Sequence, residues 1–193
     1  MKKFIKAIFS HVFLLVALLF FIYYRFETLL LGKEKAFQGV SQFLSLFPGL
    51  TGVYLRRAFY ILSLKKCSRN CYIGFGTIFS HPQTEIGKHV YIGTNCTIGK
   101  VSFGDYATLG SNVDIMNRGK QHYTENVNVP IQEQGGEYPK VCIGEDAWIG
   151  NSAVVMANVG KKSIIGAGSV VVEDTEDYVV AAGNPARIIK RRI

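Results

Sequence analysis

The stretch "VYIGTNCTIGKVSFGDYATLGSNVDI", residues 90–115, repeats one short unit on a period of six. Each unit opens with an aliphatic or aromatic residue, Gly follows, and a small or β-branched residue usually stands fourth after the opener. A period of six is typical of one short strand plus a turn, and three such units close a coil of about 18 residues. The stretch therefore predicts a mainly β fold, a parallel β-helix whose aliphatic openers point inward and stack from coil to coil.

The same unit occurs on both sides of this stretch, at 73–78 and again from 143 to 170. No helical period of useful length separates the units, which excludes a doubly wound α/β fold. The Gly after each opener suits a corner where a side chain would crowd the turn, or one where φ is positive.

One segment, "NRGKQHYTENVNVPIQEQGGEYPK" at 117–140, matches no unit. It is polar, contains Gly, and holds a single histidine, His122. Insertions between coils are tolerated at corners, and functional side chains are often carried on such loops. We therefore expect a projecting loop with a chemical role.

The net charge of +8 is unevenly distributed. Residues 1–69 contain eleven Lys and Arg against two acidic residues, whereas residues 70–193 contain eleven against twelve. The positive charge thus belongs to the most apolar third of the chain. This favours contact with a membrane surface and gives no support to a nucleic-acid partner.

Residues 7–24, "AIFSHVFLLVALLFFIYY", carry no ionised side chain and have the minimum length for crossing a bilayer core. No small-x-small cleavage site follows, which argues against a signal peptide. Two shorter helices are predicted at about 36–47 and 52–64, separated by "PGLTG". Arg56 and Arg57 fit a helix lying in the membrane interface, or a helix that caps the open end of the repeat domain. We therefore expect a membrane-associated helical region at 1–69 and a β-helix domain at 70–193.

The C-terminal run "IGEDAWIGNSAVVMANVG…IIGAGSVV…AAGNPARIIKRR" resembles the hexapeptide-repeat acyltransferases, in particular the membrane-associated sugar and polysaccharide O-acetyltransferases. The likeness covers roughly 70–193, and Trp148, the "GNPA" at 183–186 and the basic tail to 193 make it specific. It implies a left-handed β-helix, a homotrimer, and acetyl-CoA bound in grooves between subunits. One departure is "ANVG" after "VVM", a shortened turn that would alter the local CoA groove, so the choice between acetyl and another short acyl group stays open.

The resemblance also assigns candidate site residues. The loop histidine His122 would be the general base, since an imidazole can accept the alcohol proton and later protonate the thiolate. Other candidates come from position in the sequence and not from the resemblance. Asp114 or Glu125, the nearest carboxylates, or a backbone carbonyl would orient His122, and Asn117 and Tyr123, by their place in the loop, are candidates for contact with the acceptor. The matched positions for CoA are Trp148, Ala167, Gly168, Asn184 and Pro185, with Arg187 and Lys190 near the phosphates. Trp148 would equally suit packing, and the basic tail would equally suit solvent.

No GxSxG motif is present, so direct transfer without an acyl-enzyme is the simpler mechanism. The expected reaction is acetylation of a sugar hydroxyl in a glycan or lipid-linked precursor assembled at the membrane. The expected location is the cytoplasmic face, with residues 1–64 on lipid, because acetyl-CoA is a cytosolic donor. A crossing that starts with Lys2, Lys3 and Lys6 inside would put the coils outside. The more numerous basic residues downstream, and a re-entrant or interfacial anchor, would resolve this conflict.

Two other interpretations remain. A membrane-anchored β-helix scaffold would bind no acyl-CoA and would not need His122. A γ-type carbonic anhydrase would hold zinc with three histidines, but the four histidines, His11, His81, His89 and His122, lack that spacing. The cysteines form no CxxC pair, and no metal is expected.

Overall fold

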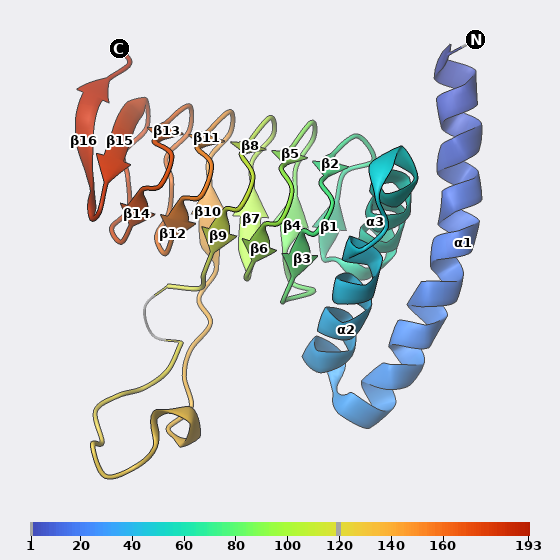
Figure 1. Cartoon of the computed structure of the whole chain (residues 1–193), viewed down its shortest axis with the longest axis horizontal. Helices are drawn as coiled ribbons and strands as arrows, with labels where there is room; N and C mark the ends of the chain where they lie inside the picture. Colours follow the sequence, from blue (N-terminus) through green and yellow to red (C-terminus); the bar gives the residue numbers. More distant parts are fainter. Residues whose placement is uncertain (1, 119–120) are drawn as a thin grey trace.

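The computed structural model describes residues 2–118 and 121–193, with side chains in the first helix from Phe9 onward. Three helices precede a β-helix whose coils are stacked along one axis (Figure 1). The helices are α1 (Lys2–Leu31), α2 (Lys33–Ser45) and α3 (Gly49–Ser63). The strands are β1 (Lys66–Cys67), β2 (Tyr72–Ile73), β3 (Ile78–Phe79), β4 (Glu85–Ile86), β5 (Tyr91–Ile92), β6 (Thr97–Ile98), β7 (Val101–Phe103), β8 (Thr108–Leu109), β9 (Asp114–Ile115), β10 (Val141–Ile143), β11 (Trp148–Ile149), β12 (Val154–Val155), β13 (Ile164–Ile165), β14 (Val170–Val171), β15 (Val179–Gly183) and β16 (Ala186–Arg191).

The strands form three sheets, one along each side of the coil. Their orders are β1-β4-β7-β10, β16-β15-β13-β11-β8-β5-β2 and β14-β12-β9-β6-β3. Neighbouring strands are parallel, except that β16 returns antiparallel to β15. The mainly β parallel β-helix predicted from the repeat is confirmed, and its first strand already begins at Lys66.

The predicted inward stacking is confirmed by the register of the sheets. Ile73 pairs with Ile92, and Ile92 with Leu109, which matches a coil of about 18 residues. All three side chains are fully buried. Stacked apolar side chains of this kind exclude water from one continuous core, which is the main favourable term in folding a solenoid.

The repeat glycines are required by the close approach of successive coils. A Cβ on Gly74 would lie 2.4 Å from the carbonyl oxygen of Gly93, and one on Gly93 would lie 2.4 Å from that of Gly110. Positive φ occurs instead at non-glycine corners such as Asn95 and Asn112. Of the two reasons that the sequence left open, crowding is therefore the correct one at these positions.

The insertion 117–140 leaves the register of the coils intact. Leu109 pairs directly with Ile149 although the loop lies between them in sequence. The loop leaves the β-helix after β9, extends away from it, and returns at β10 (Figure 1). At the shortened turn "ANVG", the sheet β1-β4-β7-β10 gains no further strand. The next coil adds only a single parallel bridge, between Ile143 and Val159.

The helices cover the open end of the β-helix. Helix α2 packs on β3, and α3 packs on β1 and β2. Tyr60 of α3 joins both parts, because its ring centroid lies 4.7 Å from that of Phe79 and its hydroxyl lies 2.7 Å from Oγ of Ser41. These contacts confirm that α3 caps the repeat domain.

Arg56 is not available to lipid phosphates, so its predicted place in the membrane interface is wrong. The side chain is fully buried and donates from Nη1 to the carbonyl oxygens of Phe47, Leu44 and Ser45. Its Nε donates to the carbonyl of Ile73 at 3.1 Å. The guanidinium therefore satisfies the free carbonyls at the end of α2 and ties them to β2, a role for which its fan of donors is suited.

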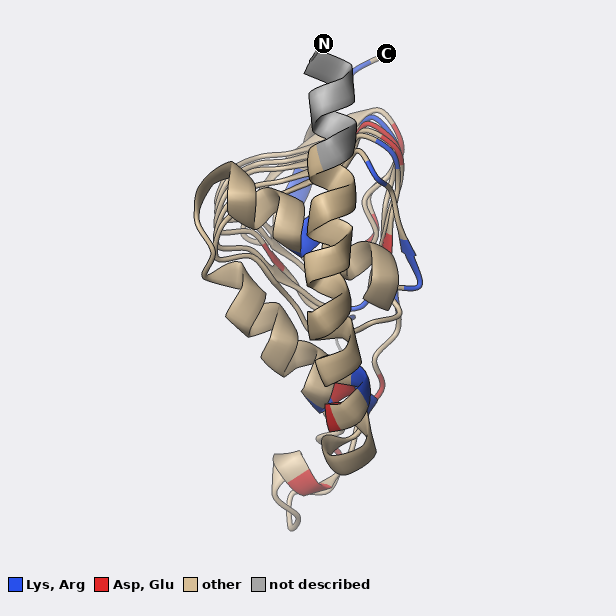
Figure 2. Cartoon of the chain, turned by 90° about the vertical axis from the view of Figure 1, so that its right-hand side faces the viewer, with Lys and Arg blue, Asp and Glu red and all other residues tan. Residues whose placement is uncertain are grey.

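Helix α1 presents an apolar face to the exterior. Residues Phe9–Leu31 are long and apolar enough to cross a membrane, and little of this segment is buried. Figure 2 shows that the described part of α1 is free of charged residues over most of its length, with charges gathered near its lower end. Helix α3 differs, because Arg56 and Arg57 lie in its middle. The large exposed side chains are Phe9, Val12, Leu15, Val16, Leu18, Leu19, Ile22, Tyr23, Phe26, Leu29, Leu30 and Leu31.

Candidate active site at the root of the loop

A polar pocket of about 480 Å³ lies where the loop leaves the β-helix. Its walls come from α2, from the corner after β3, from β6 and β9, and from both ends of the loop. The lining residues are Gln38, Ser80, His81, Thr97, Gly99, Asp114, Ile115, Met116, Asn117, Gln121 and Tyr138. The volume suits a small molecule, and amide, hydroxyl, carboxylate and imidazole groups together can bind a polyhydroxylated ligand.

His81 is the buried imidazole of this pocket, with 6% of its surface exposed. Nδ1 lies 3.2 Å from Oε1 of Glu34, and Nε2 lies 3.1 Å from Nδ2 of Asn117. The ring centroid of Tyr138 is 5.4 Å from that of His81. The ring of His81 therefore contacts Glu34 on α2, Asn117 at the start of the loop, and Tyr138 near the end of the loop.

His122, the predicted base, is carried on the loop with an exposed side chain. The residue before it, Gln121, is the one that lines the pocket. A β-type contact between the N–H of Tyr123 and the carbonyl of Gly135 holds the two limbs of the loop together next to His122. His122 thus lies beside the pocket in sequence but faces the exterior of the single chain.

The other predicted loop residues fall in different environments. Tyr123 donates from its hydroxyl to Glu137 at 3.0 Å, and this hydrogen bond raises the pKa of Tyr123. Asn117 is buried, and both polar atoms of its side chain have partners. Its Oδ1 accepts from the N–H of Lys100 at 2.6 Å, and its Nδ2 faces His81. Of the two candidate carboxylates, Asp114 lines the pocket and Glu125 is exposed on the loop.

The candidate CoA residues are distributed over one sheet. Trp148 pairs with Ile164, Ile164 with Val180, and Val180 with Lys190. These four side chains stand in one row on the outer face, and at about 4.8 Å per strand the row is about 14 Å long. The Trp148 side chain is 53% exposed, so packing in the core of this chain, the alternative that the sequence left open, does not apply.

The two predicted turns lie at corners next to this row. Ala167 and Gly168 are exposed, and Gly168 has a φ of 67° with open space around it. The exposed Asn184–Pro185 peptide is cis and closes the hairpin of β15 and β16. In the tail, Arg191 pairs with Glu176, whereas Arg187 and Lys190 form no ion pair within the described part of the chain. Both side chains are exposed.

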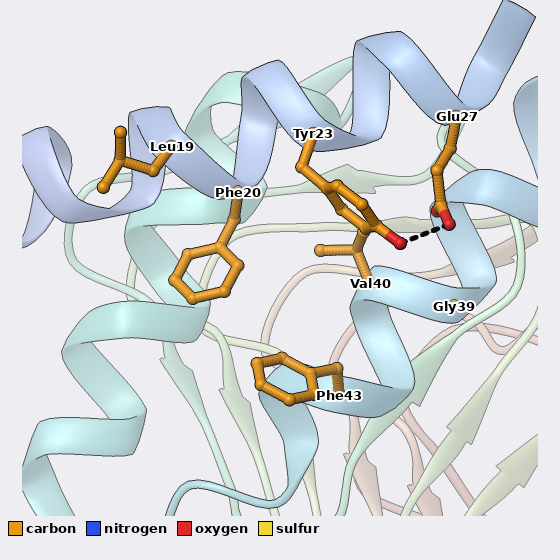
Figure 3. A pocket seen from close by; sticks show the side chains of 7 residues that line it. All are labelled: Leu19, Phe20, Tyr23, Glu27, Gly39, Val40 and Phe43. Carbon is orange, nitrogen blue, oxygen red and sulfur yellow. Dashed lines mark hydrogen bonds between the residues drawn. The ribbon is translucent and has the colours of Figure 1, made fainter.

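A second hollow, of about 470 Å³, lies between α1 and α2 (Figure 3). It is lined by Leu19, Phe20, Tyr23, Glu27, Gly39, Val40 and Phe43. Its polar feature is the hydrogen bond from Tyr23 to Glu27. This groove opens on the apolar face of α1 and offers no histidine, so it suits an apolar chain and not the chemistry of acyl transfer.

Within residues 2–118 and 121–193, no group of three or more His, Cys, Asp and Glu is arranged to hold a metal ion. His81 and Gln38 line the pocket, and Glu34 contacts His81, although none of the three was a predicted site residue. The residues concerned come from α2 and from the corner after β3, and only the way in which α2 packs on the coil brings them together. No sequence motif marks them.

The repeat domain is similar to known proteins in sequence. A model for the hexapeptide repeat of succinyl-transferase matches residues 83–116 and 140–173, on either side of the loop. A galactoside O-acetyltransferase from Lactococcus lactis is 34% identical over 132 residues, covering 64% of this chain and 61% of the relative. The chain thus spans less than two thirds of that relative's length.

Two solved structures share the fold. A maltose O-acetyltransferase from Clostridium difficile superposes with a TM-score of 0.70 at 24% identity, covering 84% of this chain and 88% of the other. A galactoside acetyltransferase in complex with coenzyme A gives a TM-score of 0.61 at 23% identity, covering 81% and 79%. The β-helix predicted from the repeat is the fold of these proteins.

Proposed function

We propose that this chain is a hexapeptide-repeat acetyltransferase, and that it transfers the acetyl group of acetyl-CoA to a sugar hydroxyl. The matches of its repeat and of its sequence to that family support the proposal. The observation that carries the proposal is the insertion between two coils, which bears His122 and stands beside a polar pocket. The relatives named above act on galactosides or maltose, and the amides, hydroxyls and carboxylate of the pocket suit an acceptor of that chemical class.

The proposed chemistry is a direct transfer. The oxygen of the acceptor hydroxyl attacks the thioester carbonyl of acetyl-CoA, and His122 accepts the hydroxyl proton. The tetrahedral intermediate then expels the CoA sulfur as the C–S bond breaks, and the imidazolium returns the proton to the thiolate. The products are the acetyl ester and CoA, with no covalent enzyme intermediate.

The proposed assembly is a homotrimer, and the exposed position of His122 is consistent with a site completed by a neighbouring chain. The resemblance implies that acyl-CoA binds between subunits, and a loop extending away from its own coil can meet a neighbouring chain. The row from Trp148 to Lys190 would form one wall of the groove, with Arg187 near the phosphates. Light scattering of the full chain in a mild detergent tests this assembly, and a fully active monomer would contradict it.

The acceptor is proposed to be part of a glycan carried by the membrane. Support comes from the apolar exterior of α1 and from the groove between α1 and α2, which would accommodate an apolar chain. Helix α2 separates the two hollows, since Gln38 faces the polar pocket and Gly39 faces the groove. A cytosolic donor requires the coils to lie on the cytoplasmic side. Because α2 packs on the β-helix, we favour α1 as the membrane contact and not a hairpin of α1 with α2.

Acetyl transfer to defined acceptors tests the activity directly. The full chain in detergent would be incubated with labelled acetyl-CoA and, separately, methyl β-galactoside, maltose, or a lipid extract containing glycolipids. We expect label in a sugar ester that mild base releases. Binding of acetyl-CoA without transfer to any sugar or glycolipid would overturn the O-acetyltransferase, and failure to bind acetyl-CoA would favour a scaffold.

A further inference from the structure

The two ends of the loop meet at one side chain that the proposed chemistry does not use. Asn117, the first residue of the loop, is hydrogen-bonded to His81, and Tyr138, near its end, packs beside the same ring. His81 is in turn joined to Glu34 of α2, in the helical region. One buried imidazole with a partner on each nitrogen therefore joins both ends of the loop to α2.

The hydrogen bonds determine which nitrogen carries the proton. Oδ1 of Asn117 accepts from the N–H of Lys100, so the amide group that faces His81 is the donor Nδ2. Nε2 of His81 must therefore present its lone pair. The single ring proton then resides on Nδ1 and is donated to the carboxylate of Glu34.

Protonation of this ring would break the arrangement. A second proton on Nε2 would point at the NH₂ group of Asn117, so that two donors would face each other. Rotating the Asn117 amide would satisfy His81 but would turn the same NH₂ group toward the N–H of Lys100. Either way, one buried donor at the root of the loop loses its acceptor, which is costly where water is excluded.

We propose that neutral His81 is a positioning residue that holds both ends of the loop 117–140 and thereby the place of His122, with Glu34 selecting its Nδ1–H tautomer. The inference rests on the proposed function for the importance of His122, but the contacts that carry it do not depend on that function. The titratable groups that face His81 are Glu34 on α2, Asp114 on β9 and Tyr138 on the loop. Carboxyl and phenol groups as classes change charge outside about pH 5.5 to 8, whereas imidazoles as a class change charge within it.

Hydrogen exchange of the full chain in detergent, without acyl donor or acceptor, tests this directly. Protection of loop amides within 121–138 would be compared at about pH 8 and pH 5.5, corrected for intrinsic exchange. For the wild type we expect about tenfold faster exchange at the lower pH. His81→Gln, which keeps a donor for Glu34 and an acceptor for Asn117 but cannot be protonated, should stay protected at both. His81→Phe should lose protection at both.

A matched control is His89→Gln. His89 also contacts an asparagine, with Nε2 3.0 Å from Nδ2 of Asn70, but it lies on a coil corner. Its ring stacks on Tyr106 of the next coil, and among the described residues of the loop it has no hydrogen-bond partner. This variant should behave as the wild type. The proposal is overturned if His81→Gln keeps the acid-dependent increase, or if a folded His81→Phe retains full protection. Should His81→Phe fail to fold, the pH profile of His81→Gln still decides.

Discussion

Lys140, the last residue of the loop, places Nζ 2.5 Å from Oε1 of Glu85 on β4. Lys65, which precedes β1, approaches the same oxygen at 2.9 Å. The returning end of the loop is therefore clamped to the first complete coil and to the end of the helical region. Hydrogen bonds from Lys140 and Lys65 lower the pKa of Glu85 to about 2.

This clamp predicts a specific pH dependence of stability. The pKa of Glu85 is lower in the folded chain than the 4.5 of a free Glu, so its stabilisation is complete above about pH 4.5 and is lost as the pH falls toward 2. Glu85→Gln should lower the free energy of unfolding at pH 7 by about 0.5–1 kcal/mol. Urea denaturation of both proteins should show this difference shrinking below pH 4.5. A difference that stays constant from pH 7 to 3 would contradict the clamp.

Because the guanidinium of Arg56 is buried and hydrogen-bonded, we expect its removal to lower the free energy of unfolding substantially. Its replacement by Met leaves the carbonyl groups of Phe47 and Ile73 without a donor inside the protein, and we expect a cost of about 2–4 kcal/mol. The control is Arg57→Met, because Arg57 is only partly buried. It lies over the Tyr54 ring, with 4.6 Å from its Cζ to the ring centroid, and makes one long hydrogen bond, 3.4 Å, to the carbonyl of Cys71. Thermal unfolding in detergent measures both. Equal small shifts for the two variants would rule out the buried role of Arg56.

The exterior of α1 predicts membrane attachment. Replacing Leu15, Leu19, Leu29 and Leu30 by Ser, all highly exposed, should move the protein from the membrane fraction to the soluble fraction without unfolding the β-helix. A control with equally exposed apolar residues away from α1 is the pair Val127→Ser and Ile193→Ser, which should change nothing. If the α1 variant still sediments with membranes in buffer of high salt, the anchor lies elsewhere.

The row across the sheet predicts how donor binding should respond to mutation. Trp148→Ala and the double variant Arg187→Ala with Lys190→Ala should each raise KM for acetyl-CoA by about tenfold with a smaller change in kcat. For the double variant, the loss should be smaller with a donor that lacks the 3′-phosphate. Arg191→Ala, whose guanidinium already pairs with Glu176, is the matched control. Equal losses with both donors would indicate a folding defect instead of phosphate contact.

The fold could be predicted from the sequence because a period of six encodes local geometry repeated many times. Each buried opener, such as Ile92 or Ile149, reports the same inward position, so errors in single units do not matter. The prediction for Arg56 was wrong. Its charge suggested lipid phosphates, whereas carbonyl groups near the end of α2 and in β2 surround its guanidinium. These are tertiary contacts, and no local sequence pattern predicts them.

The candidate site was predictable only in part, because some of its residues are brought together by tertiary contacts and not by a local sequence pattern. The loop stands out because it breaks the period, and its histidine can be read directly. His81 lies in an ordinary corner between two repeat strands, β3 and β4, so the sequence does not set it apart. Its partner Glu34 is far away in sequence, on α2. Packing of α2 on β3 creates their contact, so residue spacing carries no trace of it.

The most direct test of the account is acetyl transfer by His122→Ala. The variant should lower the transfer rate from labelled acetyl-CoA to the best of the three acceptor preparations by about 10²–10⁴-fold. Its affinity for acetyl-CoA, measured by calorimetry, should stay within about twofold of the wild type, because His122 lies on the loop and not in the row of Trp148 and Lys190. Near-normal transfer by a folded His122→Ala variant would contradict the central claim that the loop supplies the base.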